Sequence, residues 1–134
     1  MSHTPVAIGL QRTLNTSFET AYRQAQLALN AAGFKIVADV DLDPLLAKET
    51  AYSLAHRVLV VIKPEIAQRA MAVAPQVSVA LLCQVAISQP TEELVEVQAT
   101  DPLIAWGDMH AAFLRPIAEE LRDQLRHVIE AVTG

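Results

Sequence analysis

The stretch "RVLVVIKPEIAQRAMAVA", residues 57–74, places a run of branched apolar residues directly before a segment with helical periodicity. The continuous apolar run over 57–62 predicts a strand that is covered on both faces. Proline is well tolerated in the first turn of a helix, so Pro64 predicts a helix over 64–74. A strand that leads directly into a helix is typical of an α/β domain.

The preceding segments continue this alternation of strand and helix. Residues 6–11 predict a first strand. Thr16 and Glu19 have the spacing of a capping box, which predicts a helix over 17–32, and Gly33 supplies the left-handed residue that commonly ends a helix.

The next segment predicts a half-buried strand and then a short helix. Residues 34–43 alternate apolar and polar side chains, and this period places one apolar set on a single face: Phe34, Ile36, Ala38, Val40 and Leu42. Asp43 and Pro44 suit the cap and first turn of a helix over 44–55.

The C-terminal half predicts two strands and a long helix. Residues 77–88 and 94–100 carry strand patterns on either side of a proline turn, so we expect them to pair as a hairpin. Residues 108–132 predict an amphipathic helix capped by Asp108, and Pro116 predicts either a kink or a fresh helix start near Arg115.

The resulting order is β-α-β-α-β-α-β-β-α, an α/β (α+β two-layer) fold. It predicts a mixed sheet of about five strands packed with helices. No repeat or flexible linker interrupts the chain, and 134 residues suit a single domain over 1–134.

Composition narrows the function classes. The formal charge of −5 comes from 15 acidic and 10 scattered basic residues, and aromatic residues make up only 4%, so nucleic acid is not an expected partner. No apolar run approaches a membrane span, and the N-terminal residues lack a signal-peptide pattern, so we expect a soluble cytoplasmic protein. The apolar fraction of 52% favours a partner that covers extra apolar surface.

Cys83 is the only cysteine, and it has two interpretations. In the predicted strand it shares the more apolar face, which favours a buried, unreactive thiol. A catalytic or redox thiol is the alternative, if folding brings a cation near it. The opposite face carries small residues and one amide, and it would let a helix, a ligand or a second copy approach closely: Ser78, Ala80, Leu82, Gln84, Ala86 and Ser88.

Other candidate sites carry weaker signals. Lys63 and the helix start at Glu65 lie just beyond a buried strand, where an anion could bind, although no glycine-rich phosphate loop accompanies them. Asp101 precedes Pro102 in a stretch that also holds Trp106 and His110, but an ordinary turn explains it, and this structural interpretation is favoured.

Metal binding is not expected from this sequence. Three aspartates share one side of a predicted strand and could hold a hard cation, but a solvated face is the simpler interpretation: Asp39, Asp41 and Asp43. The four histidines form no pair or cluster with metal-ligand spacing. We therefore predict neither a metal nor another cofactor.

Three segments in order carry a family resemblance: "AGFKIVADVDL", "VLVVIKPEIAQRAMAVAPQVSVALLCQVAI" and "VEVQATDP". Followed by an amphipathic helix, they resemble the three-hundred-and-second family of domains of unknown function over about residues 5–132. The resemblance implies a compact α/β domain that commonly forms a homodimer. It supplies no catalytic residues.

This chain departs from the resembled family at two of three short sequence motifs. The family usually has Asn-Pro at Lys63-Pro64 and Pro-Cys at Leu82-Cys83, while Asp101-Pro102 keeps its Asp-Pro. Any site that the usual residues shape is therefore in doubt here.

Two hypotheses of function follow. The first is a non-catalytic, homodimeric cytoplasmic domain that binds a small molecule or a protein partner. The alternative is a thiol-dependent enzyme or redox carrier that uses Cys83. A subunit of a larger assembly would share the surface features of the first hypothesis.

Overall fold

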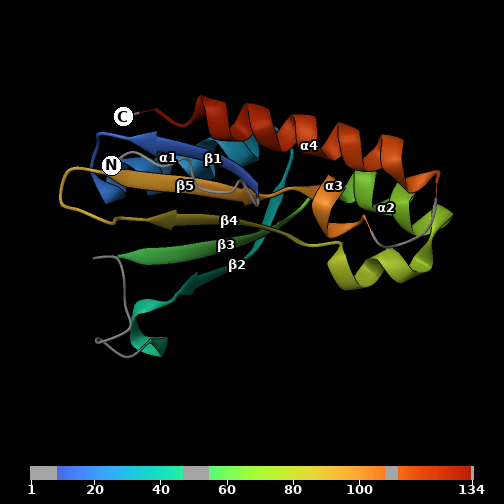
Figure 1. Ribbon diagram of the computed structural model, residues 1–134, viewed down its shortest axis with the longest axis horizontal. Helices are drawn as coiled ribbons and strands as arrows, with labels where there is room; N and C mark the ends of the chain where they lie inside the picture. The colour runs from blue at the N-terminus through green and yellow to red at the C-terminus, as the bar shows by residue number, and fades with distance from the viewer. Residues whose placement is uncertain (1–8, 47–54, 108–111, 134) are drawn as a thin grey trace, which may run out of the picture.

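A computed structural model describes residues 9–46, 55–107 and 112–133 of the chain (Figure 1). Its five strands are β1 Gly9–Leu14, β2 Lys35–Asp41, β3 His56–Ile62, β4 Cys83–Ser88 and β5 Val95–Thr100. Its helices are α1 Phe18–Ala31, α2 Pro64–Val73, α3 Pro102–Ala105 and α4 Leu114–Ala131, with short 3₁₀ helices η1 Asp43–Leu45 and η2 Pro75–Ala80.

The strands form one sheet in the order β1-β5-β4-β3-β2. Each neighbouring pair is antiparallel, so the predicted two-layer α/β architecture is confirmed but the predicted mixed sheet is wrong. The reason lies in α2, which sits beyond one end of the strands rather than across the sheet (Figure 1). The chain therefore re-enters the sheet from the end at which it left, and β4 runs antiparallel to β3.

Helices cover one face of the sheet. Both α1 and α4 contact strands and each other, and a single apolar core fills the space between these two layers. Sheet residues of this face are fully buried: Leu59, Val61, Val85, Ile87, Val95 and Val97. On the opposite face Val58 and Val60 are only half-buried. The prediction that β3 is covered on both faces is therefore wrong for this chain alone.

Strand β2 contains a bulge that changes the predicted alternation. Ile36 pairs with Val61, whereas Ala38 pairs with Val60, so Val37 is an extra residue between them. An extra residue reverses the face on which later side chains lie. Ile36 therefore packs against the core, while Ala38 and the residues in phase with it lie on the face without helices.

The boundaries of α1 follow local chemistry. Ser17, not Thr16, caps the helix, because its hydroxyl accepts the N–H of Thr20 at 3.1 Å. At the other end Gly33 has φ +85°, which confirms the predicted left-handed residue. The strand expected over 6–11 is observed from Gly9, and residues 1–8 lie outside the described residues.

The first half of the predicted strand over 77–88 is helical instead. Residues Pro75–Ala80 form η2, and β4 begins only at Cys83. Tertiary contacts explain the difference, because the buried indole N–H of Trp106 donates to the Ala80 carbonyl at 2.9 Å and Val77 packs into the core. The hairpin of β4 and β5 is confirmed.

The long C-terminal helix begins at Leu114, so Pro116 lies in its first turn and causes no kink. The predicted Asp108 cap and His110 lie outside the described residues, as do residues 47–54 of the helix predicted over 44–55. None of the helices in the described part of the chain combines the length and hydrophobicity that a membrane crossing requires.

Candidate functional site

An open hollow in the described part of the chain lies where β3 meets α2. This α2 groove has a volume of about 530 Å³ and is lined by Ile62, Pro64, Ala67, Gln68, Met71, Ala72 and Leu81. The helix residues recur at a spacing of three and four, which places them on one side of α2. The lining is apolar apart from one amide side chain, so the groove suits an apolar ligand.

The groove continues into the sheet face that no helix of the described residues covers, called the open sheet face below. Ile62 is in phase with Val60 and Val58 along β3, so these three side chains lie on the same face. Val58 pairs with Ala86 on β4, and Ala86 pairs with Gln98 on β5. The middle of the β2–β3 half of this open sheet face is therefore apolar, with Lys35 opposite Ile62 at one end of it and His56 at the other, and the β5–β1 half is polar.

Gln84 lies on this open face, close to the groove along the strand. It pairs with Val60, which is two residues from the groove residue Ile62. Its backbone N–H donates to the Thr100 hydroxyl at 3.1 Å, and its side chain is exposed. Among the residues singled out from the sequence, Gln84 is the one whose side chain the fold leaves available beside the apolar surface.

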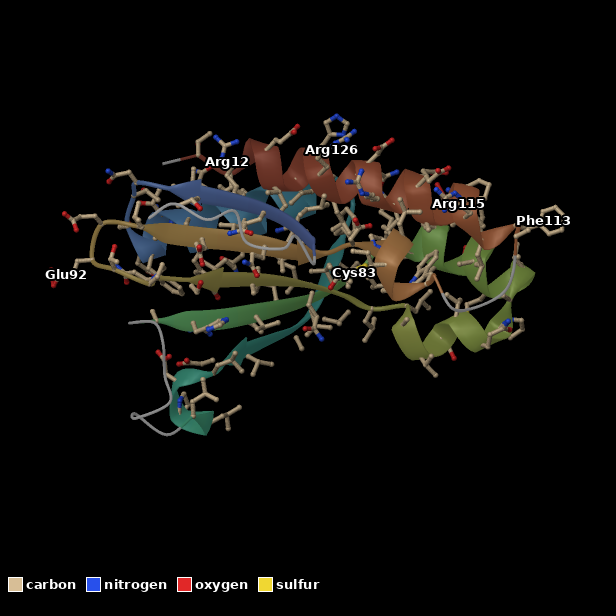
Figure 2. The ribbon with its side chains drawn as sticks, in the orientation of Figure 1. Arg12, Cys83, Glu92, Phe113, Arg115 and Arg126 are labelled. Carbon is tan, nitrogen blue, oxygen red and sulfur yellow. The ribbon has the colours of Figure 1, made fainter. Side chains whose placement is uncertain are left out.

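Cys83 lies on the other face, at the start of β4 (Figure 2). Its exposure is 2%, and it pairs with the buried Val61. Burial in apolar surroundings raises the pKa of the thiol to about 11, and no cation of the described residues lowers it. At neutral pH the group is protonated, which favours its interpretation as core filling.

Lys63 turns away from the start of α2. Its Nζ donates to the carbonyl of Ala32 at the C-terminal end of α1 and lies 5.4 Å from the centre of the Phe34 ring. A cation is favourable at a helix C-terminus, because the last carbonyls lack partners within the helix. The ammonium group is therefore engaged by α1 and the aromatic ring.

Glu65 belongs to a separate ion-pair network that joins α2 to α4. Arg69 Nη2 lies 2.8 Å from Glu65 Oε2, and the same guanidinium binds both Glu120 oxygens at 3.0 and 2.6 Å. Arg69 lowers the pKa of Glu120. With two carboxylates near the start of α2, the surroundings do not favour an anion, and the predicted anion site stays a prediction.

Asp101 connects α3 to α4. Its Oδ1 accepts the N–H of Leu103 at 2.9 Å, and its Oδ2 lies 3.0 Å from Nε of Arg122. Asp101 is therefore the N-cap of a short helix rather than a residue of an open turn. The four residues have different partners: Lys63 contacts Ala32, Glu65 pairs with Arg69, Asp101 pairs with Arg122, and Gln84 lies on the open sheet face.

A polar cluster that the sequence did not reveal lies at the edge of β2. Asp39 accepts a hydrogen bond from the Tyr22 hydroxyl and another from Arg57 Nε at 3.0 Å, while the Arg57 guanidinium lies 5.0 Å from the centre of the Tyr22 ring. The interaction with Asp39 raises the pKa of Tyr22. Asp41 instead accepts the backbone N–H of Asp43. Within residues 9–46, 55–107 and 112–133 no cluster of three or more His, Cys, Asp or Glu side chains could hold a metal ion.

The α2 groove was also missed from the sequence. In the sequence its helix residues form an ordinary amphipathic pattern. The small side chains at Ala67 and Ala72 were the one feature that could have indicated a groove. Their significance depends on Leu81, which the strand prediction placed in a regular strand and which instead lies after η2. The groove is therefore a product of the loop conformation between α2 and β4.

Comparisons with known proteins give a family and a fold. None of the curated proteins is similar enough to be matched. A crystal structure of an uncharacterized conserved protein DUF302 from Bacillus stearothermophilus superposes with a TM-score of 0.84 at 17% identity, over 95% of this chain and 99% of that one. The model of the domain of unknown function DUF302 matches residues 10–132, and the chain therefore belongs to the DUF302 family.

Proposed function

We propose that this protein is a non-catalytic cytoplasmic binding domain that takes up a small apolar molecule in the α2 groove and pairs with a second copy through its open sheet face. One observation supports both parts of the proposal. Within the described residues helices cover a single face of the sheet, and apolar side chains of β2 and β3 continue on the other face into the groove. An apolar surface of this kind typically marks a binding region.

The size and lining of the groove favour a small molecule. Ligand sites in proteins commonly have volumes of about 300–1,000 Å³, with apolar walls and few polar groups that set orientation. The α2 groove has about 530 Å³, and the Gln68 amide supplies a donor and an acceptor at its wall. A mainly apolar ligand with one hydrogen-bonding group fits this lining.

The open sheet face favours a second copy because it carries few charges. In the paired strands its charged residues are Glu96, with Gln11 3.5 Å from it, and Lys35 at the end of β2. Depletion of charge at the centre is a general feature of protein interfaces. The half-buried valines beside it would lose their remaining contact with water when two faces meet.

A non-catalytic role is supported by the state of the titratable groups. The thiol of Cys83 is buried, and burial raises its pKa to about 11, so it lacks the thiolate that a nucleophile requires. The lone cysteine also suits a reducing compartment, because it permits no internal disulfide.

Binding of N-phenylnaphthylamine, an uncharged fluorescent probe, tests the ligand part of the proposal. We expect saturable binding to the intact protein. Ala72→Phe adds a ring at an exposed alanine of the groove, and it should weaken binding by about tenfold, which corresponds to about 1.4 kcal/mol.

The matched control is Ala131→Phe, which places the same ring at an exposed alanine at the end of α4. It should leave binding unchanged. Equal effects of the two variants, or binding that never saturates, would contradict a ligand site in the groove. Native mass spectrometry of freshly purified protein would then show whether any small molecule is retained elsewhere.

A further inference from the structure

A second hollow lies between α3 and the first turns of α4, and it shares no lining residue with the α2 groove. Its volume is about 240 Å³, and its lining is mixed, with apolar side chains from Leu103, Leu114 and Ala118 beside the polar Arg115. Leu114 and Ala118 are both buried at 2% exposure, so the α4 side of this α3–α4 pocket is part of the packed core.

One wall of the pocket is aromatic and fixed in position. Trp106 lines it, is 4% exposed, and donates its indole N–H to the Ala80 carbonyl at 2.9 Å. Gly107 follows in a tight turn, where a Cβ would lie only 3.1 Å from the Leu103 carbonyl oxygen. The indole is therefore held by the backbone around it before any ligand arrives.

A single cation lines the pocket among the residues that the structure describes there. The side chain of Arg115 is 71% exposed, and its ion-pair partner is Glu119, with Nε 3.5 Å from Oε2. An exposed pair at this distance is weak and exchanges readily. The first turn of α4 holds no acidic residue, so the helix end adds to the positive potential.

We infer that the α3–α4 pocket binds a small aromatic carboxylate, with its ring against Trp106 and its carboxylate on the Arg115 guanidinium. An engineered apolar cavity of about 150 Å³ accepts benzene, so a pocket of about 240 Å³ has room for one ring with a short acidic side chain. A planar guanidinium can form two parallel hydrogen bonds with a carboxylate, so the pocket should bind the carboxylate more tightly than a neutral analogue.

The emission of Trp106 provides a direct readout, because it is the only tryptophan in the chain. Phenylacetate is the probe, and the corresponding alcohol, phenylethanol, is its neutral control. We expect a saturable change in emission with phenylacetate, and binding of phenylethanol that is weaker by about tenfold, since hydrogen bonds to charged groups are the stronger class.

Two arginine variants test the role of the cation. Arg115→Gln should weaken phenylacetate binding by about tenfold and leave phenylethanol binding unchanged. Arg126→Gln removes another exposed arginine of α4, paired with Asp123 at 2.8 Å, and should affect neither probe. Circular dichroism spectra that match the parent protein would show that each variant is folded.

Three results would overturn the inference. An emission change that does not saturate would exclude a pocket site for this ligand class. Equal affinity for the acid and the alcohol, or equal losses in Arg115→Gln and Arg126→Gln, would exclude carboxylate recognition by Arg115. None of these results would change the expected binding of N-phenylnaphthylamine in the α2 groove, because the two hollows have separate linings.

Discussion

A Cβ atom built on Gly33 would lie 3.0 Å from Nζ of Lys63, the ammonium group that binds the C-terminal carbonyl of α1 at Ala32. The glycine therefore serves two purposes, since its φ of +85° ends the helix and its lack of a side chain admits the lysine. The end of α1 and the start of α2 are joined at this contact.

Gly33→Ala should lower the free energy of unfolding by about 1 kcal/mol or more, because an L-residue is strained at positive φ and the new methyl group displaces Lys63. Urea denaturation of the single variant and of Gly33→Ala in a Lys63→Met background measures the coupling. We expect a smaller cost in the Lys63→Met background. Equal costs in both backgrounds would show that backbone strain alone is responsible.

The sequence predicted the elements whose periodicity is regular. The helix over 17–32 and the strand start after it were correct within a residue or two, because capping and alternation are local signals. The antiparallel order was not predictable in the same way. It depends on where α2 lies relative to the sheet, and amphipathic periodicity gives the buried side of a helix but not its position.

The candidate sites were harder to predict than the elements. Residues 77–82 carry a strand pattern, yet the contact between Trp106 and the Ala80 carbonyl belongs to a 3₁₀ segment, which requires the tertiary fold. The lining of the α2 groove depends on the loop that this segment forms, and the lining of the α3–α4 pocket depends on α3. Lys63 and Asp101 were identified correctly as residues at element boundaries, but their partners lie more than twenty residues away in the chain.

The buried thiol gives a prediction about reactivity. With an exposure of 2% and a pKa raised to about 11 by burial, Cys83 should react with iodoacetamide at pH 8 on the timescale of unfolding rather than that of a free thiol. Mass spectrometry of samples quenched over time, with and without urea, measures both rates. Rapid alkylation of the native protein would revive the thiol-enzyme hypothesis.

The ion pairs of Arg69 predict a pH dependence of stability. Arg69 lowers the pKa of Glu120, so the folded state binds a proton less readily than the unfolded state, in which the pKa is near 4.5. The contribution is therefore fully present above this value and is lost as the pH falls through the lower folded pKa. Arg69→Gln should destabilise the protein at pH 7 and have little effect in strong acid.

Thermal unfolding of Arg69→Gln at several pH values checks this expectation, with Arg126→Gln as the control. Arg126 pairs with Asp123 inside α4, so its loss removes no contact between helices. High salt should reduce the effect of Arg69→Gln, because the pair is exposed. If Arg69→Gln destabilised the protein equally at neutral and acid pH, its effect would come from lost packing of the side-chain stem and not from the ion pair.

Pairing of two copies through the open sheet face predicts a defined response to a buried charge. Val60 is half-buried on this face, between Ala38 on β2 and Gln84 on β4. Val60→Glu would place a carboxylate without a partner inside the interface, at a cost of several kcal/mol, so the dimer should dissociate. Sedimentation velocity at micromolar concentration measures the mass directly.

The matched control for Val60→Glu is Val37→Glu, at the β2 bulge, where the valine is already 53% exposed. This variant should remain dimeric, because its new carboxylate stays in water. Dissociation by Val37→Glu but not by Val60→Glu would place the contact at the edge of β2. A parent protein that sediments as a monomer would contradict the pairing itself, and the apolar strip along β3 would then require a different partner.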